Sequence, residues 1–243
     1  MPDVKGAWNA PDHGVGAAGG NGAAGGNGAA DGIGTADTSD STRVLDLRAE
    51  PSPRCIAIFG GVYSNHHALR AVLADATASG AERAICLGDL GGFGPHPDRS
   101  IEILRDAGIL TLQGNYDDSV GNGLDDCQCG YTDPRDNHYA QISYDYTLAH
   151  TSEHHRAWLR GLPTGALLTM GGVTIRLAHG SPRRVNEFLW ESTTPRAFIQ
   201  RLLWEQDTDV SLRRTRGSVD TQRGPDRGAI AARYERCGTS GCA

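Results

Sequence analysis

Three polar residues of types that bind metal ions each come within a few residues of the end of a short apolar run. These residues are Asp89, Asn115 and His179. In open α/β sheets, ligands gather outside the carboxyl ends of the strands. A carboxylate, an amide and an imidazole together suit a divalent transition metal better than calcium. Any one of the three could instead cap a turn, but three strand ends in one chain favour a shared site.

The elements that would position these residues are short apolar runs separated by glycine-containing turns and amphipathic segments. Repetition of strand, turn and helix predicts a largely parallel sheet with helices on its faces. Two further strands flank Gly171-Gly172, which is a hairpin signal. We predict strands at 56–59, 84–87, 109–112, 166–170 and 173–178, and helices that begin at Ser64 or Asn65, near Pro97, at Ser152 and at Thr194-Pro195.

Composition divides the 243 residues into three regions. Residues 1–53 contain a tandem Gly/Ala/Asn repeat that has little to bury, so we predict a disordered tail. Residues 54–210 carry the periodic apolar pattern of a globular domain. Residues 211–243 are rich in arginine and are predicted to form a second tail of uncertain order. A basic arm for nucleic acid is the alternative, but no interleaved aromatic residues support it.

Charge and hydropathy narrow the classes of function. A net charge of −6 does not suggest a general nucleic-acid binder. No apolar run of about 18 residues is present, so no membrane-spanning helix is expected. The first residues lack the basic-then-apolar pattern of a secretion signal, which favours a cytoplasmic protein.

Several ordered motifs resemble a known family. Residues 88–95 read GDLGGFGP, residues 114–117 read GNYD, and residues 177–183 read LAHGSPR. Together with the strand, turn and helix at 56–69, they resemble the calcineurin-like metallophosphoesterases. The bacterial branch with YfcE-type phosphodiesterases and diadenosine-tetraphosphatase-like proteins is the most similar.

This resemblance implies a sandwich of two mixed sheets flanked by helices, and hydrolysis of phosphomonoesters or phosphodiesters by two divalent metals. It implies that Asp89 bridges the metals and that Asn115 and His179 bind the second one. Tyr116 would hydrogen-bond the phosphoryl group or the leaving oxygen. Arg183 would clamp a phosphate through two hydrogen bonds.

The sequence departs from the family pattern at the first metal. The opening Asp-x-His motif is replaced by Gly61 and Tyr63, and no histidine follows His179, so the family's last motif and final strands are missing. The remaining ligands predict one divalent transition metal per chain, Mn, Fe or Zn. His66 is the best candidate for a substitute ligand.

The opening turn leaves two interpretations, and a cysteine pair leaves three. Gly60, Gly61 and Asn65 could bind phosphate through free backbone N–H groups, or the glycines could only permit a tight turn. Cys127 and Cys129 could pack, hold a soft ion or form a redox pair.

Our leading interpretation is a metal-dependent phosphoester hydrolase acting on a phosphorylated small molecule or nucleotide. The alternative is a non-catalytic relative that binds such a ligand in the same cleft. The change in composition after residue 210 also fits a truncated or frame-shifted chain, whose uncovered strand ending at His179 would favour homo-oligomers or aggregation.

Overall fold

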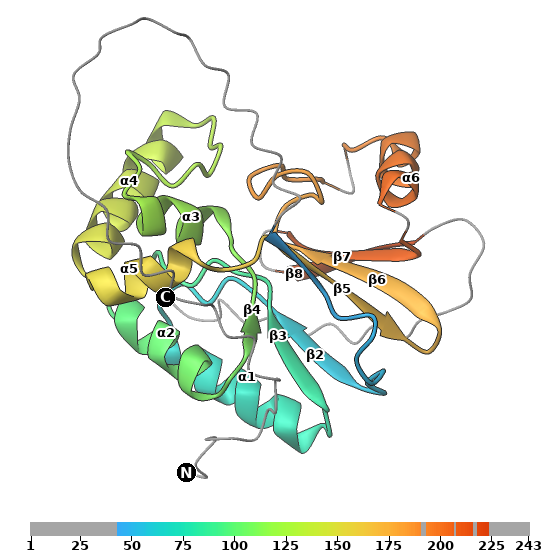
Figure 1. Ribbon diagram of the computed structural model, residues 1–243. Helices are drawn as coiled ribbons and strands as arrows, with labels where there is room; N and C mark the ends of the chain where they lie inside the picture. The colour runs from blue at the N-terminus through green and yellow to red at the C-terminus, as the bar shows by residue number, and fades with distance from the viewer. Residues whose placement is uncertain (1–42, 191–192, 207, 216–217, 224–243) are drawn as a thin grey trace, which may run out of the picture.

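The computed structural model describes residues 43–190, 193–206, 208–215 and 218–223 (Figure 1). Within them, two small sheets lie next to each other, with most of the helices on one side of them and the helix at residues 196–205 on the other. The predicted α/β class with two sheets is confirmed. None of the helices in these ranges has the length and hydropathy needed to span a bilayer.

The first sheet is parallel and has three strands in the order β2-β3-β4. The strands are β2 (Ile56–Phe59), β3 (Arg83–Cys86) and β4 (Leu110–Thr111). Helix α1 (His66–Ala78) joins β2 to β3, and α2 (Pro97–Asp106) joins β3 to β4. Parallel neighbours need such crossovers, so the predicted alternation is confirmed.

Local sequence accounts for the starts of both helices. The Asn65 side chain accepts a hydrogen bond from the Ala68 N–H at 3.0 Å, which caps α1 as predicted. Pro97 is the first residue of α2, where its missing N–H costs no helical hydrogen bond.

The second sheet is mixed, with the order β1-β5-β6-β7-β8. Its strands are β1 (Val44–Asp46), β5 (Gly165–Met170), β6 (Val173–Ala178), β7 (Val210–Thr215) and β8 (Ser218–Arg223). β5 and β6 form the predicted hairpin, with positive φ angles at Gly171 and Gly172.

Four further helices follow in the described residues. They are α3 (Asn115–Asn122), α4 (Pro134–Ala149), α5 (Glu153–Arg160) and α6 (Arg196–Glu205). The predicted helices at Ser152 and Thr194-Pro195 correspond to α5 and α6. Helices α3 and α4 were not predicted.

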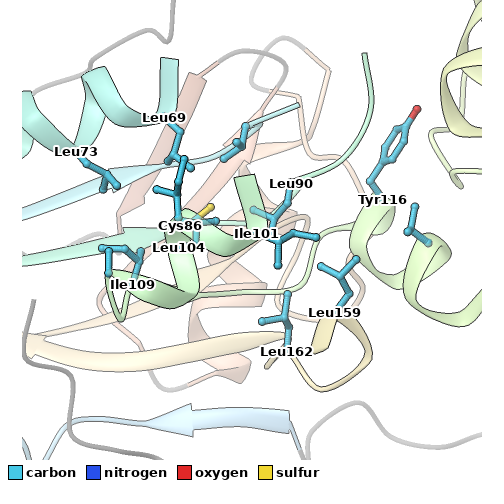
Figure 2. Packing of buried hydrophobic residues seen from close by; sticks show 14 of the residues in the cluster. Leu69, Leu73, Cys86, Leu90, Ile101, Leu104, Ile109, Tyr116, Leu159 and Leu162 are labelled. Atoms are coloured by element: carbon cyan, nitrogen blue, oxygen red, sulfur yellow. The ribbon is translucent and has the colours of Figure 1, made fainter. Parts of the chain in front are cut away.

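Two apolar cores hold these layers together. One fills the space between the helices and the three-stranded sheet; it includes Leu73, Cys86 and Leu104, which are fully buried (Figure 2). The other lies between the two sheets, where Ile85 and Leu87 meet Leu177. Removing one such leucine side chain costs about 2–5 kcal/mol of stability. Both faces of β3 are therefore buried, which fixes where its carboxyl end points.

Three predictions about the ends of the domain need correction. The predicted tail 1–53 includes β1, which pairs in parallel with β5, while residues 1–42 lie outside the described residues. The predicted tail 211–243 includes most of β7 and all of β8, so strands do follow residue 210; residues 224–243 lie outside the described part. β6 is consequently an interior strand between β5 and β7, and the open edge that motivated the predicted homo-oligomer does not exist there.

Candidate functional site

The structure brings Asp89, Asn115 and His179 together. The Nε2 atom of His179 lies 3.1 Å from Asn115 Oδ1 and 3.5 Å from Asp89 Oδ1. All three side chains are buried, with at most 4% of each residue exposed. They come from the ends of β3, β4 and β6, so the site lies where the two sheets meet. The convergence predicted from the strand ends is present.

The orientation of the His179 ring is set by the other sheet. Its Nδ1 atom lies 2.6 Å from the Leu87 carbonyl oxygen, directly after β3. A carbonyl can only accept, so Nδ1 carries the proton and Nε2 faces Asp89 and Asn115. Metal-binding histidines usually donate their other ring N–H to a carbonyl or carboxylate, and His179 is oriented in this way.

Asp89 occupies a strained backbone position. Its φ angle is +58°, and Tyr63 and Ser64 in the facing turn also have positive φ angles, of 50° and 57°. Non-glycine residues rarely adopt this region, and such strain concentrates at functional sites. Burial raises the pKa of the Asp89 carboxyl, while His179 and the N–H of Tyr116 act in the opposite direction.

Asp117 holds the two turns of the site together, a role that the sequence reasoning missed. Its buried carboxylate accepts hydrogen bonds from three backbone N–H groups: Asp89 at 2.8 Å, Leu90 at 2.9 Å and Gly114 at 2.8 Å. Burial, and then the charge of Asp89, raise the pKa of Asp117 to about 7. The signal was available, because an Asp three residues into a helix can bond back to its first N–H groups.

Tyr116 meets the site through its backbone only. Its N–H donates to Asp89 Oδ1 at 3.2 Å, but the residue is 1% exposed. Its ring packs beside Phe93 and Tyr144, and in Figure 2 its hydroxyl points away from the other labelled side chains. Contact between this phenol and a phosphoryl group would require the ring to move.

Arg183 is engaged by a neighbour. Its guanidinium forms an ion pair with Glu187 through two nitrogens and lies over the ring of Phe198, 5.2 Å from the ring centroid. Burial would raise the pKa of Glu187, but hydrogen bonds from Arg183 and Ser181 outweigh it and lower that pKa. The Arg183 guanidinium, which was predicted to bind phosphate, is therefore paired with the Glu187 carboxylate in this structure.

The predicted phosphate-binding turn uses its N–H groups internally. Asn65 is taken up as the cap of α1, and its own N–H bonds to the Val62 carbonyl. Three further N–H groups of the turn bond to the carbonyls that follow β3: Gly61 to Gly88 at 2.9 Å, Tyr63 to Asp89 at 3.2 Å and Ser64 to Leu90 at 2.7 Å. The premise of a free N–H is thus wrong at Gly61, whose positive φ of 68° fits the tight-turn interpretation, while phosphate binding at Gly60 stays a prediction.

The ring contacts of His66 are with two other histidines and not with the three converging side chains. Its ring centroid lies 4.0 Å from that of His67 and 5.5 Å from that of His96. Burial, followed by the nearby positive groups, lowers the pKa of His66. Tyr63, at the second position of the lost motif, packs edge-on against Phe93 with centroids 5.2 Å apart. Nothing in these contacts replaces the ligands of a first metal.

The donor set fits one cation. Among the described residues, no three His, Cys, Asp or Glu side chains gather into a metal-holding group. Asp89 and His179 could supply two such ligands, and the amide oxygen of Asn115 could be the third donor. A carboxylate oxygen, an amide oxygen and an imidazole nitrogen suit Mn, Fe or Zn in a site with open positions.

Comparisons with known proteins agree with this architecture. No protein-family model matches the chain. Hypothetical protein PH1004 from Pyrococcus horikoshii OT3 is 20% identical with a TM-score of 0.53, over 65% of this chain and 68% of that one, which is a likeness of fold. A metallophosphoesterase from Sphaerobacter thermophilus is 28% identical with a TM-score of 0.42, over 57% and 52% of the two chains. In its motifs GDLGGFGP, GNYD and LAHGSPR, the chain resembles the calcineurin-like metallophosphoesterases.

A curated relative is also similar in sequence. The uncharacterized protein MJ0912 of Methanocaldococcus jannaschii is 29% identical over 140 residues. These cover 58% of this chain and 54% of that protein, so the metallophosphoesterase-like chain matches about half the length of this relative.

Proposed function

We propose that this chain is a metal-dependent phosphoester hydrolase that binds one divalent transition metal, Mn, Fe or Zn. Its ligands would be Asp89 Oδ1, Asn115 Oδ1 and His179 Nε2. The observation that carries the proposal is that Asn115 Oδ1 lies 3.1 Å and Asp89 Oδ1 lies 3.5 Å from His179 Nε2, where strands of the two sheets end. Acceptor atoms that face one another are stabilised when a cation lies between them.

The chain's own residues would orient the site. When bound, the ion supplies a Lewis acid for a phosphoryl oxygen. The Leu87 carbonyl holds the His179 ring, and Asp117 fixes the backbone of Asp89 and Gly114. Because these contacts are buried, the donor atoms need little rearrangement on binding.

The substrate we propose is a phosphorylated small molecule or nucleotide. A two-metal mechanism is not supported, since Gly61 and Tyr63 stand where the family has Asp and His. The same two residues favour the second candidate function, a non-catalytic relative that binds a phosphorylated ligand at this site.

Elemental analysis combined with hydrolysis of bis-p-nitrophenyl phosphate, with and without Mn²⁺, tests the proposal. We expect at most one ion per chain and hydrolysis that depends on Mn²⁺. Asn115→Ala should lower Mn²⁺ affinity and hydrolysis by about tenfold or more. The matched control is Asn122→Ala, an amide on the same helix that bonds to Asp118.

Each outcome separates the candidates. Two bound ions would show that substitute ligands exist. Absence of bound metal together with absence of hydrolysis would refute the enzyme, and thermal protection by phosphate in that metal-free protein would favour the non-catalytic relative.

A further inference from the structure

The Asn115 side chain is held at both ends of its amide. Its Nδ2 donates to the Cys127 carbonyl at 2.7 Å and lies 3.6 Å from Cys129 Sγ. Its Oδ1 lies 3.1 Å from His179 Nε2. An amide has one donor end and one acceptor end, so fixing the nitrogen on a carbonyl directs the oxygen towards His179.

The carbonyl that holds this amide belongs to a covalently closed loop. Cys127 and Cys129 form a disulfide across a single residue, Gln128, whose φ angle is +52°. Cys127 is 5% exposed. The two cysteines thus form a disulfide, the bond that the redox-pair interpretation requires.

The loop is also anchored on the helix that carries Asn115. Gln128 Nε2 donates to Asp118 Oδ2 and to Ser119 Oγ, both at 3.2 Å, and both residues lie on α3. Gln128 Oε1 accepts from Asn186 Nδ2 at 3.2 Å, which links the loop to the segment after His179. The loop therefore contacts the segments of two candidate ligands.

We propose that the Cys127–Cys129 disulfide is a positioning element that keeps the Asn115 amide oxygen directed into the candidate metal site. The inference rests on the function proposed above. Reduction by a dithiol breaks the S–S bond, the two dithiol hydrogens pass to the two sulfurs as two thiols, and the dithiol becomes a disulfide. The opened loop then releases the Cys127 carbonyl, and Asn115 loses its fixed orientation.

The first test compares Mn²⁺ affinity in oxidised protein, in protein reduced with dithiothreitol and desalted, and in the double variant Cys127→Ser/Cys129→Ser. Mn²⁺ is chosen because it prefers oxygen ligands to thiols. We expect about tenfold to hundredfold weaker binding in the reduced protein and in the double variant. The matched control is Cys55→Ser, which removes an exposed free thiol and should leave the affinity unchanged.

The second test needs no metal. The side-chain amide signal of Asn115, assigned by its loss in Asn115→Ala, is followed by nitrogen–proton NMR in metal-free protein. We expect this signal to move on reduction and in the double variant, to return on reoxidation, and to stay in place in Cys55→Ser. This readout distinguishes positioning from a merely structural role of the loop.

The outcomes separate the two proposals. A signal that moves in a protein that never binds metal would refute the proposed function and leave the positioning role standing. An unmoved signal, an Mn²⁺ affinity equal in oxidised and reduced protein, or a peptide mass showing both cysteines as thiols in air-oxidised protein would overturn the positioning proposal.

Discussion

Substitution of Gly114 by alanine tests the packing of the site with the smallest change available. Gly114 has φ −94° and ψ 174°, which alanine adopts freely, so the backbone conformation itself is not strained. A Cβ added there would lie 2.5 Å from Asp89 Oδ1, 2.6 Å from Asp89 N and 2.8 Å from His179 Cε1. One methyl group would thus press on two of the three candidate ligands.

The expected magnitude follows from these contacts. Real Cβ contacts are essentially never under 3.0 Å, so Asp89 must shift by about half an ångström. Both the Gly114 N–H and the Asp89 N–H donate to Asp117 Oδ2, so a shift of Asp89 away from Gly114 would weaken these hydrogen bonds. Overpacking typically costs about 1–3 kcal/mol, and weakening these bonds puts Gly114→Ala near the upper end of that range.

Urea unfolding and Mn²⁺ titration of the purified variant measure both effects. We expect a loss of about 2–3 kcal/mol of stability and a large loss of Mn²⁺ affinity. The matched control is Gly161→Ala, whose added Cβ would come no closer than 3.4 Å to Trp158 O, with φ −82°. If Gly114→Ala were as stable as Gly161→Ala and bound Mn²⁺ like the wild type, the described arrangement of Asp89 and His179 would be wrong.

Two further substitutions test the neighbours of the site. Burial raises the pKa of Asp117 in the native state to about 7, above its ordinary value of 3.8, so the native state binds this proton more tightly and stability falls as pH rises from about 4 to about 7. Asp117→Asn should flatten that fall in urea unfolding across this range, and an unchanged slope would contradict it. Arg183→Ala breaks a partly exposed ion pair with Glu187, so we expect about 0.5 kcal/mol of lost stability and unaltered Mn²⁺ affinity. A tenfold fall in Mn²⁺ affinity would show instead that Arg183 contributes to the site.

The sequence predicted those elements whose local signals agree with their environment. The strand at 56–59 and the hairpin around Gly171-Gly172 combine apolar runs with turn residues, and both are present. Helix α3 was missed because its residues, NYDDSVGN, have poor helix propensity. Its stability comes from Asp117 and from burial of Tyr116 and Val120, which are tertiary effects.

The candidate site was predictable only as far as strand topology determines it. Asp89, Asn115 and His179 converge because the ends of β3, β4 and β6 meet. The pairing of Arg183 with Glu187 depends on the turn between them. The Gly61 N–H donates to the carbonyl of Gly88, which lies in the turn after β3, far along the sequence. Side-chain and backbone partners of this kind are determined by the fold and cannot be predicted from the sequence motif alone.

The contact between His179 and the Leu87 carbonyl joins residues 92 positions apart and belongs to both sheets at once. The three donor atoms can therefore meet only after both sheets have formed and docked, and a partly folded chain offers no equivalent site. An ion that binds only the native state adds to its stability by mass action, by about 2.7 kcal/mol at a free concentration one hundred times the Kd. Metal supply would then set how long the folded chain survives proteolysis, whether or not a substrate is present.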